Sequence, residues 1–166
     1  SCRSDRRKSA WRTQPASVSC PIGQRECKKT LNYKGKSARI GCAIGAPGRR
    51  KEIHERLAAL GASLATVISP RSYVSAHAHI GDGSIVMHHA MVNAAARIGA
   101  NCIINSKSLV EHDAVIGDHC HVATTAVVNG GVVVGEGSFI GSGAVLKECI
   151  TLPSGSFVKA NAIHKG

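Results

Sequence analysis

Aromatic residues are scarce: they make up 3% of the 166 residues, although apolar residues reach 43%. A core built from such a sequence must be narrow and filled by aliphatic and small side chains. No apolar run approaches the ~20 residues that a membrane-spanning helix needs, and no signal-peptide pattern stands at the start. We therefore expect one domain, or one domain with an appendage, and no membrane partner.

Paired-cysteine motifs are also missing. The chain has seven cysteines, an odd number that contains no CxxC pair. This pattern disfavours a zinc ribbon and a secreted disulfide scaffold. It favours reduced thiols and a cytoplasmic protein.

Acidic residues are rare in the first third of the chain. Residues 1–51 hold 14 Lys or Arg and 2 Asp or Glu, whereas residues 52–166 hold 7 and 8, so the net charge of +11 belongs to one end. A basic, apolar-poor segment buries too little surface to offset its ordering entropy, and we expect residues 1–37 to be disordered or atypical. A nucleic-acid-binding tail is the alternative. Only Trp11 and Tyr33 lie nearby as aromatics and no such motif occurs, so we expect no nucleic-acid partner.

The second half is rich in a six-residue repeat. An aliphatic residue recurs at every sixth position from Val74 to Val158, and a residue that is mostly Ala, Ser or Cys follows four positions after each. This period excludes an amphipathic helix and a plain alternating strand, and it matches the hexapeptide signature of a β-helix. Related segments recur 18 residues apart, as in IGDGS, IGANC and IGDHC. Three hexads therefore make one coil, and we predict an all-β-dominated parallel β-helix of about five coils over residues 71–163.

Both repeated positions should face the core. Cys102 and Cys120 fall in one column of small inward positions, where we interpret them as core filler rather than a disulfide. The residue before each aliphatic one should face outward, which gives three stripes. The first is Met91, Leu109, Val127, Val145 and Ile163; the second is His79, Arg97, Val115, Val133 and Thr151; the third is Ile85, Ile103, His121, Phe139 and Phe157.

The first and third stripes are almost wholly apolar, and a monomer does not normally expose patches of this size. The N-terminal segment is too polar to cover two faces. We call the faces of the prism that carry the first and third stripes face one and face three. We predict a homotrimer in which face one of each subunit packs on face three of its neighbour.

Titratable residues cluster in the stretch EHDAVIGDHCH at 111–121. His121 interrupts the third stripe, and His112 lies at the corner that follows face one. In one chain the core separates them, so we predict a composite site in which His112 of one subunit approaches His121 of the next. A purely structural histidine at 121 is the alternative. His119, also at a corner, is interpreted as a surface residue.

Residues 49–60 are helix-like, with Ile53, Leu57 and Leu60 on one side and Gly61 as the C-terminal cap. A short strand is expected at Leu64–Ile68.

The segment NSKSLVEHDAVIGDHCHVATTAVVNGGVVVGEGSFIGSGAV resembles the sialic acid O-acetyltransferase family of sugar acyltransferases, the NeuD type. That family also includes N-acetyltransferases of nucleotide-linked amino sugars. The resemblance extends over residues 39–160 and implies a left-handed β-helix. It implies that residues 38–70 are a strand–helix–strand remnant of a nucleotide-sugar-binding domain, whose first strand and Gly-rich turn are missing from residues 1–37.

The resemblance also implies a reaction. Acetyl-CoA would donate an acetyl group to a hydroxyl or amine of a sugar or nucleotide-linked sugar, for bacterial surface glycan synthesis, with no metal. His112 matches the catalytic histidine, which takes a proton from the acceptor, and Asp113 is the acid that would orient it. Glu111 is the rival acid.

Three more residues match family positions at the cofactor. His121 would hydrogen-bond the acetyl carbonyl alongside a backbone N–H. Gly130 and Ser142 would lie along the CoA groove between neighbouring solenoids, where a missing side chain permits close approach.

Two other functions stay open. A zinc enzyme like the hexapeptide-repeat carbonic anhydrases needs three converging imidazoles; that family's paired histidines lie five apart, a spacing that His79, His112, His119 and His121 do not offer. A non-catalytic or truncated homologue is favoured by the missing N-terminal strand. The presence of His112, Asp113 and His121 opposes it.

Overall fold

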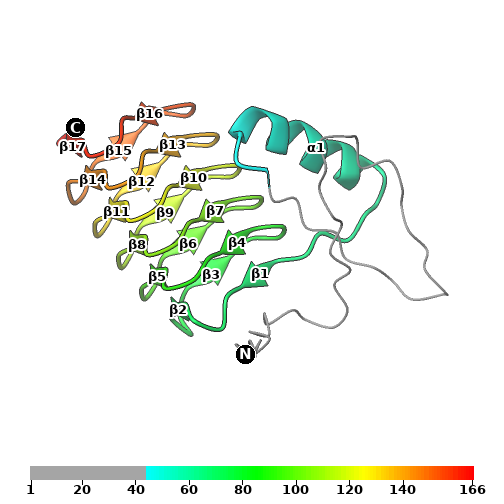
Figure 1. Ribbon diagram of the computed structural model, residues 1–166, viewed down its shortest axis with the longest axis horizontal. Helices are drawn as coiled ribbons and strands as arrows, with labels where there is room; N and C mark the ends of the chain where they lie inside the picture. Colours follow the sequence, from blue (N-terminus) through cyan, green and yellow to red (C-terminus); the bar gives the residue numbers. More distant parts are fainter. Residues whose placement is uncertain (1–43) are drawn as a thin grey trace, which may run out of the picture.

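The computed structural model describes residues 44–166, which form one helix followed by seventeen two-residue strands. The expectations for residues 1–37, and for a strand at the start of the 38–70 segment, lie outside the described residues. The helix, α1 (Pro47–Ala59), stands beside a stack of short strands (Figure 1).

The strands form the three faces of a prism, each a parallel sheet. Face one holds β2 (Tyr73–Val74), β5 (Met91–Val92), β8 (Leu109–Val110), β11 (Val127–Val128), β14 (Val145–Leu146) and β17 (Ile163–His164). Face two holds β3 (His79–Ile80), β6 (Arg97–Ile98), β9 (Val115–Ile116), β12 (Val133–Val134) and β15 (Thr151–Leu152). Face three holds β1 (Val67–Ile68), β4 (Ile85–Val86), β7 (Ile103–Ile104), β10 (His121–Val122), β13 (Phe139–Ile140) and β16 (Phe157–Val158).

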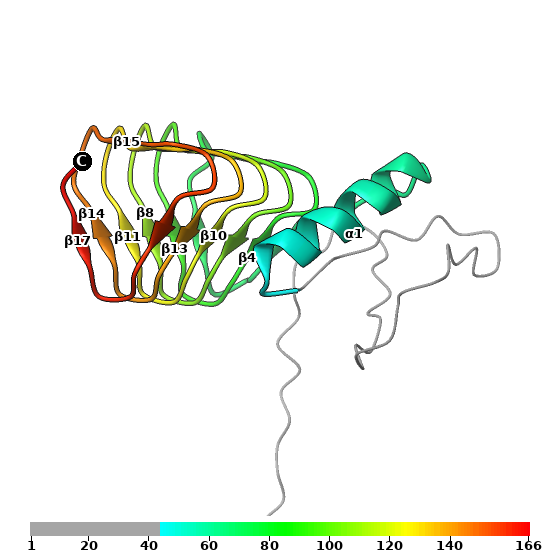
Figure 2. The same cartoon turned by 90° about the horizontal axis from the view of Figure 1, so that it is seen from above.

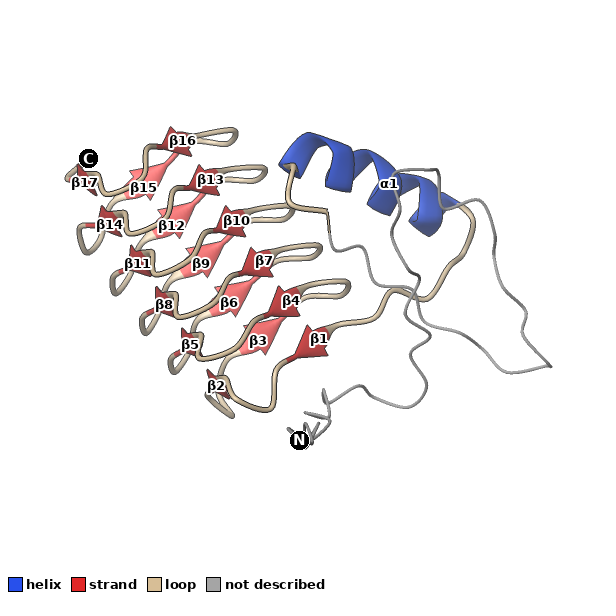
Figure 3. Cartoon of the chain, viewed as in Figure 1, coloured by secondary structure: helices blue, strands red, loops and turns tan. Residues whose placement is uncertain are grey.

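Each strand pairs with the strands 18 residues away, as His121 does with Phe139. The repeat in the sequence therefore equals one coil, and the prediction of a left-handed parallel β-helix is confirmed (Figures 2 and 3). The coils begin earlier than residue 71, because β1 pairs with β4. The end of the strand expected at Leu64–Ile68, Val67–Ile68, is thus the first strand of face three.

The core is the inside of the prism. Every aliphatic repeat residue from Val86 to Val158 is at most 5% exposed. The Cys102 and Cys120 thiols donate to the carbonyls of Gly117 and Gly135 at 3.1 and 3.2 Å, and both cysteines are free. Their interpretation as small core filler is confirmed.

The corners require an unusual backbone. From Gly83 onward, the second residue of each tight turn has a positive φ, as at Asp113 (60°) and His119 (61°). This is the left-handed region that Asp and Asn tolerate better than most residues. A different requirement acts at Gly117, where an added Cβ would lie 2.7 Å from the Glu136 backbone nitrogen in the next coil. Coils therefore approach too closely there for any side chain.

Helix α1 begins with Pro47 and ends before Gly61, whose N–H donates to the Ala58 carbonyl at 2.9 Å with φ of 70°. The side it buries differs from the one predicted. Leu57 is buried, but Leu60 is 69% exposed, because the helix has ended before it. Arg50 is instead completely buried. Within residues 44–166, no helix is long and apolar enough to cross a membrane.

Candidate functional site

His112 stands at the corner after β8, with its side chain 67% exposed. Its Nδ1 donates a hydrogen bond to the Asp113 carboxylate at 2.8 Å. Because a carboxylate only accepts, the ring proton is on Nδ1 and the exposed Nε2 carries the lone pair. This hydrogen bond, and then the charges of Asp113 and Glu111, raise the pKa of His112. The arrangement is that of an oriented general base.

The structure distinguishes the two acids beside His112. Glu111 accepts a hydrogen bond from the Asn93 amide at 2.7 Å, one coil away. Asp113 turns back onto the imidazole because its own backbone occupies the left-handed corner position. Of the two candidates, Asp113 is the acid that hydrogen-bonds His112.

Gly130 lies one coil further on, against the His112 ring. A Cβ on Gly130 would lie 2.9 Å from both Cε1 and Nε2 of His112. The neighbouring Gly131 N–H donates to the His112 carbonyl at 3.0 Å. The structure thus brings His112, Asp113 and Gly130 together, whereas Ser142 lies at the corner after β13 on face three, along another edge of the prism. The expected contacts of Gly130 and Ser142 with CoA stay predictions.

His121 points outward from β10 on face three, yet it is 8% exposed. Its Nδ1 donates to the Gly45 carbonyl at 3.1 Å, and its ring meets Phe139 edge-on at 5.0 Å. Burial lowers the pKa of His121, against a smaller opposing effect of the Gly45 carbonyl. His121 and His112 belong to different parts of the prism, as predicted.

The third stripe is less exposed than the sequence indicates. Ile85 and Ile103 are 8% exposed in the single chain, and Gly45, upstream of α1, contacts His121. The residues just before α1 therefore cover His121 within one chain, a contact that the sequence analysis did not predict. Phe157, in the last coil, is 70% exposed and stacks on Phe139 with ring centroids 5.3 Å apart.

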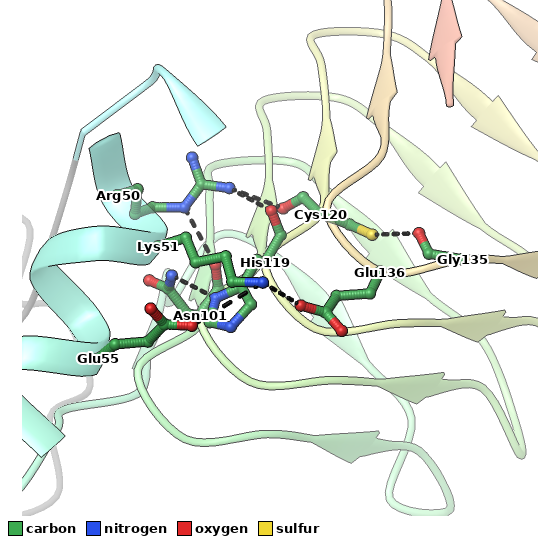
Figure 4. Close-up of polar contacts among 8 residues, drawn as sticks. All are labelled: Arg50, Lys51, Glu55, Asn101, His119, Cys120, Gly135 and Glu136. Atoms are coloured by element: carbon green, nitrogen blue, oxygen red, sulfur yellow. Dashed lines mark hydrogen bonds and ion pairs between the residues drawn. The ribbon is translucent and has the colours of Figure 1, made fainter. Parts of the chain in front are cut away.

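His119 is not a surface residue. It is 7% exposed, and its Nδ1 pairs with the Asn101 amide at 2.8 Å (Figure 4). Its ring also meets that of His54 edge-on at 5.2 Å. Burial, and then the charge of Lys51, lower the pKa of His119. The prediction failed because α1 covers this corner, and the repeat carries no signal for where the helix docks.

Sequence reasoning also missed Arg50, which donates to the carbonyls of Asn101, His119 and Cys120 (Figure 4). Beside it, Lys51 pairs with Glu136 at 2.6 Å on the surface. The helical spacing could have indicated this burial. Arg50 lies seven residues, or about two helical turns, before Leu57, and therefore on the same buried side of α1, unlike Arg49 and Lys51.

No group of three or more His, Cys, Asp or Glu side chains in residues 44–166 is arranged to hold a metal ion.

The model of the bacterial transferase hexapeptide family matches residues 95–130 and 113–148, the coils that contain His112 and His121. The coils over residues 95–148 thus carry the hexapeptide repeat of that family. No curated protein matches the chain.

Solved structures extend the likeness of this hexapeptide-repeat chain. The acetyltransferase domain of PglB from Neisseria gonorrhoeae, in complex with acetyl coenzyme A, is 36% identical with a TM-score of 0.74, over 76% of this chain and 62% of that one. PerB from Caulobacter crescentus, in complex with CoA and GDP-perosamine, is 31% identical with a TM-score of 0.75, over 80% and 65%. WeeI from Acinetobacter baumannii, at 23% identity and a TM-score of 0.64, shares the fold. The chain thus covers less than two thirds of PglB and PerB.

Proposed function

We propose that this chain is an acetyl-CoA-dependent acetyltransferase that acts on a nucleotide-linked sugar. The observation that carries the proposal is the His112–Asp113 pair, in which Asp113 holds Nδ1 of an exposed imidazole and leaves Nε2 to act as the base. Support comes from two structures that share the fold at more than 30% identity, one holding acetyl coenzyme A and one holding CoA with GDP-perosamine. We place its action in the cytoplasm and in surface glycan synthesis.

The chemistry follows from the protonation of the pair. Bound acetyl-CoA supplies a thioester that an amine or hydroxyl can attack. His112 Nε2 takes the proton of the attacking group, and Asp113 stabilises the resulting imidazolium through the Nδ1 hydrogen bond. His112 then returns this proton to the departing sulfur. A general base of this kind contributes roughly 10²–10⁴ in rate.

We favour an amine over a hydroxyl as the acceptor. The Caulobacter protein is a perosamine N-acetyltransferase, and in two of its solved structures one histidine is replaced, by asparagine or by alanine. Acetylation of a hydroxyl, as the sialic acid family resemblance implies, is the second candidate. The His112–Asp113 pair serves either acceptor.

We further propose that the enzyme is a homotrimer with composite sites. Face one remains largely uncovered within the described chain: Tyr73 is 56%, Met91 42% and Ile163 69% exposed. A second copy of the chain would bury this apolar stripe. Because His112 and His121 are on different parts of one prism, only a neighbouring subunit can complete a site that uses both.

The proposal is tested by incubating the full chain with acetyl-CoA and a panel of acceptors, namely GDP-perosamine, a UDP-linked amino sugar and the matching sugars without an amino group. Released CoA thiol and the acetylated product are measured by colour reaction and mass spectrometry. Transfer should occur with an amino sugar and be lost in His112→Ala, while Glu111→Gln retains it. Folded protein that forms no acetylated product with any acceptor would support the non-catalytic alternative.

A further inference from the structure

We propose that Arg50 is a positioning residue that acts through the Gly45 carbonyl to hold His121 as the neutral Nδ1–H tautomer, with Nε2 as a hydrogen-bond acceptor. Its consequence for acetyl transfer rests on the proposed function, whereas the tautomer itself can be measured without any activity. The argument proceeds from the buried guanidinium to the imidazole.

Arg50 joins α1 to the solenoid. Its Nε donates to the Asn101 carbonyl at 3.0 Å, and its Nη2 donates to the carbonyls of His119 and Cys120 at 2.8 and 3.1 Å. These carbonyls belong to the same corner in two successive coils, the later of which leads directly into β10. Figure 4 shows the guanidinium reaching from the helix to this corner. A buried cation is tolerated only with such partners, and the rigid fork of donors suits several carbonyls at once.

The same guanidinium also holds the segment upstream of α1. Its Nη1 donates to the Ile44 carbonyl at 2.9 Å and to the Gly45 carbonyl at 3.4 Å. The Gly45 carbonyl in turn accepts the hydrogen bond from His121 Nδ1 at 3.1 Å. One arginine therefore fixes the corner before β10 and the carbonyl that faces the first residue of β10.

Two independent bonds define the tautomer of His121. The Gly45 carbonyl can only accept, so Nδ1 carries the proton. On the other side, Asn105 Oδ1 accepts the Ser106 N–H at 2.7 Å, which orients the amide so that Nδ2 faces His121 Nε2 at 3.3 Å. An amide nitrogen only donates, so Nε2 carries the lone pair. Burial also lowers the pKa of His121, which favours the neutral ring.

This tautomer changes what His121 offers a substrate. A neutral ring held as Nδ1–H cannot donate from Nε2 to an acetyl carbonyl, which is the role that the family resemblance implies. It can accept a hydrogen bond from an amine, a hydroxyl or a thiol. The Asn105 bond is long at 3.3 Å, so a stronger donor can replace it. We infer that His121 orients a donor group of the substrate, and that Arg50 keeps it able to do so.

The experiment uses the full chain labelled with ¹⁵N in histidine. Long-range proton–nitrogen NMR distinguishes the protonated from the unprotonated ring nitrogen, and the His121 signals are assigned by their loss in His121→Gln. Wild type should show Nδ1–H. Arg50→Lys, which keeps the charge but loses the fork, should show a mixture of both tautomers and a kcat for acetyl transfer reduced about tenfold, the loss of one hydrogen bond to a charged group. The matched control is Arg49→Lys on the exposed side of α1, which should change neither.

A second variant tests the Gly45 bond even if Arg50→Lys fails to fold. Asn105→Asp places a carboxylate opposite Nε2, which then needs a proton. If the Gly45 carbonyl still holds Nδ1–H, both nitrogens become protonated; if it does not, His121 switches to the neutral Nε2–H tautomer, which contradicts the proposal. An Nε2–H tautomer in wild type, or an unchanged tautomer in folded Arg50→Lys, would also overturn it. Absence of acetyl transfer in wild type would refute the proposed function alone, because the NMR result stands without it.

Discussion

Gly130 lies directly against the imidazole of His112, so close that a methyl group on Gly130 would come within 2.9 Å of the ring atoms Cε1 and Nε2. Side chains are otherwise accepted at this corner position, since Ala94 and Glu148 occupy it in other coils. The restriction at Gly130 therefore comes from the histidine above it, not from the backbone. The absence of a side chain at Gly130 therefore leaves the space that the His112 imidazole occupies.

Gly130→Ala should impair the reaction without destabilising the fold. The added Cβ displaces an exposed side chain, which has room to move, so the free energy of unfolding should change by no more than about 0.5 kcal/mol. The displaced Nε2 no longer meets the acceptor, and misplacement by about 1 Å can lower the rate about 100-fold. Thermal unfolding and acetyl transfer measure the two effects, with Glu148→Ala as the control. A loss of stability with normal kcat would contradict this role for Gly130.

Asp113→Asn should change the pH dependence as well as the rate. The base is the neutral form of His112, and Asp113 raises the pKa of that imidazole, so activity rises with pH through this raised pKa. Without the carboxylate the pKa falls, and the rise in kcat/KM should move to lower pH. The maximal rate should fall about tenfold or more, because the imidazolium loses its partner. Asn suits the left-handed backbone at this corner, so stability should be retained.

Glu111→Gln is the matched variant for this pH profile. Its carboxylate contacts Asn93 and raises the pKa of His112 by its charge alone, so the rise in kcat/KM should move to lower pH by less than in Asp113→Asn. A larger displacement in Glu111→Gln than in Asp113→Asn would reverse the assignment of the two acids.

The periodic part of this molecule could be predicted from the sequence almost residue by residue. Every coil has the same order of inward, outward and corner positions. The inward and outward columns, the three faces and the corner position of His112 therefore follow from the spacing of residues alone. The start of the solenoid was missed although the repeat reaches it, since Ile68 lies six residues before Val74 and Ser72 follows four positions after Ile68. Pro70 was interpreted as the end of an isolated strand, whereas the chain turns there into the next face.

What the spacing could not give is contact between parts that do not repeat. The docking of α1 depends on one guanidinium that donates to backbone carbonyls. Every residue has such a carbonyl, so the sequence does not indicate which of them accept these hydrogen bonds. Burial of Arg50 and His119 and the contact of Gly45 with His121 all follow from that docking. The choice between Glu111 and Asp113 likewise depended on the backbone conformation of a corner, not on residue type.

Acid should weaken the attachment of α1 to the solenoid. The rings of His54 and His119 meet across this contact, and burial lowers the pKa of both. The charge of His119 lowers the pKa of His54 further, and the charge of Lys51 lowers that of His119 further. A histidine with a lowered folded pKa binds fewer protons than in the unfolded chain, so the free energy of unfolding falls as the pH drops below about 6.5. The loss levels off only below the lowered folded pKa. The pair of His112 with Asp113 acts in the opposite direction, but it is exposed and contributes little.

The measurement is the thermal unfolding midpoint as a function of pH in wild type and in His54→Gln. The variant should lose part of the acid sensitivity, because Gln has no proton to bind, whereas the exposed His77→Gln should behave as wild type. Equal acid sensitivity in wild type and His54→Gln would show that the contact between α1 and the solenoid does not titrate.

The composite site can be tested by mixing two inactive proteins. If each site takes His112 from one subunit and His121 from its neighbour, His112→Ala and His121→Ala each inactivate every site of their own trimer. When the two variants are unfolded, mixed in equal amounts and refolded, random assortment puts both native histidines at about a quarter of the sites. Acetyl transfer should therefore return to about a quarter of the wild-type rate, and a mixture of the two variants without refolding should remain inactive.

Two results would contradict the proposal of a composite site. Light scattering that finds single chains in solution removes the neighbour that the site needs. Activity of a refolded mixture no higher than that of its parents, in trimers shown by mass spectrometry to contain both variants, means that one chain supplies both histidines or that His121 takes no part. The physical basis of the expectation is that the prism core stands between the two rings, so no motion of side chains within one subunit can bring them to the same thioester.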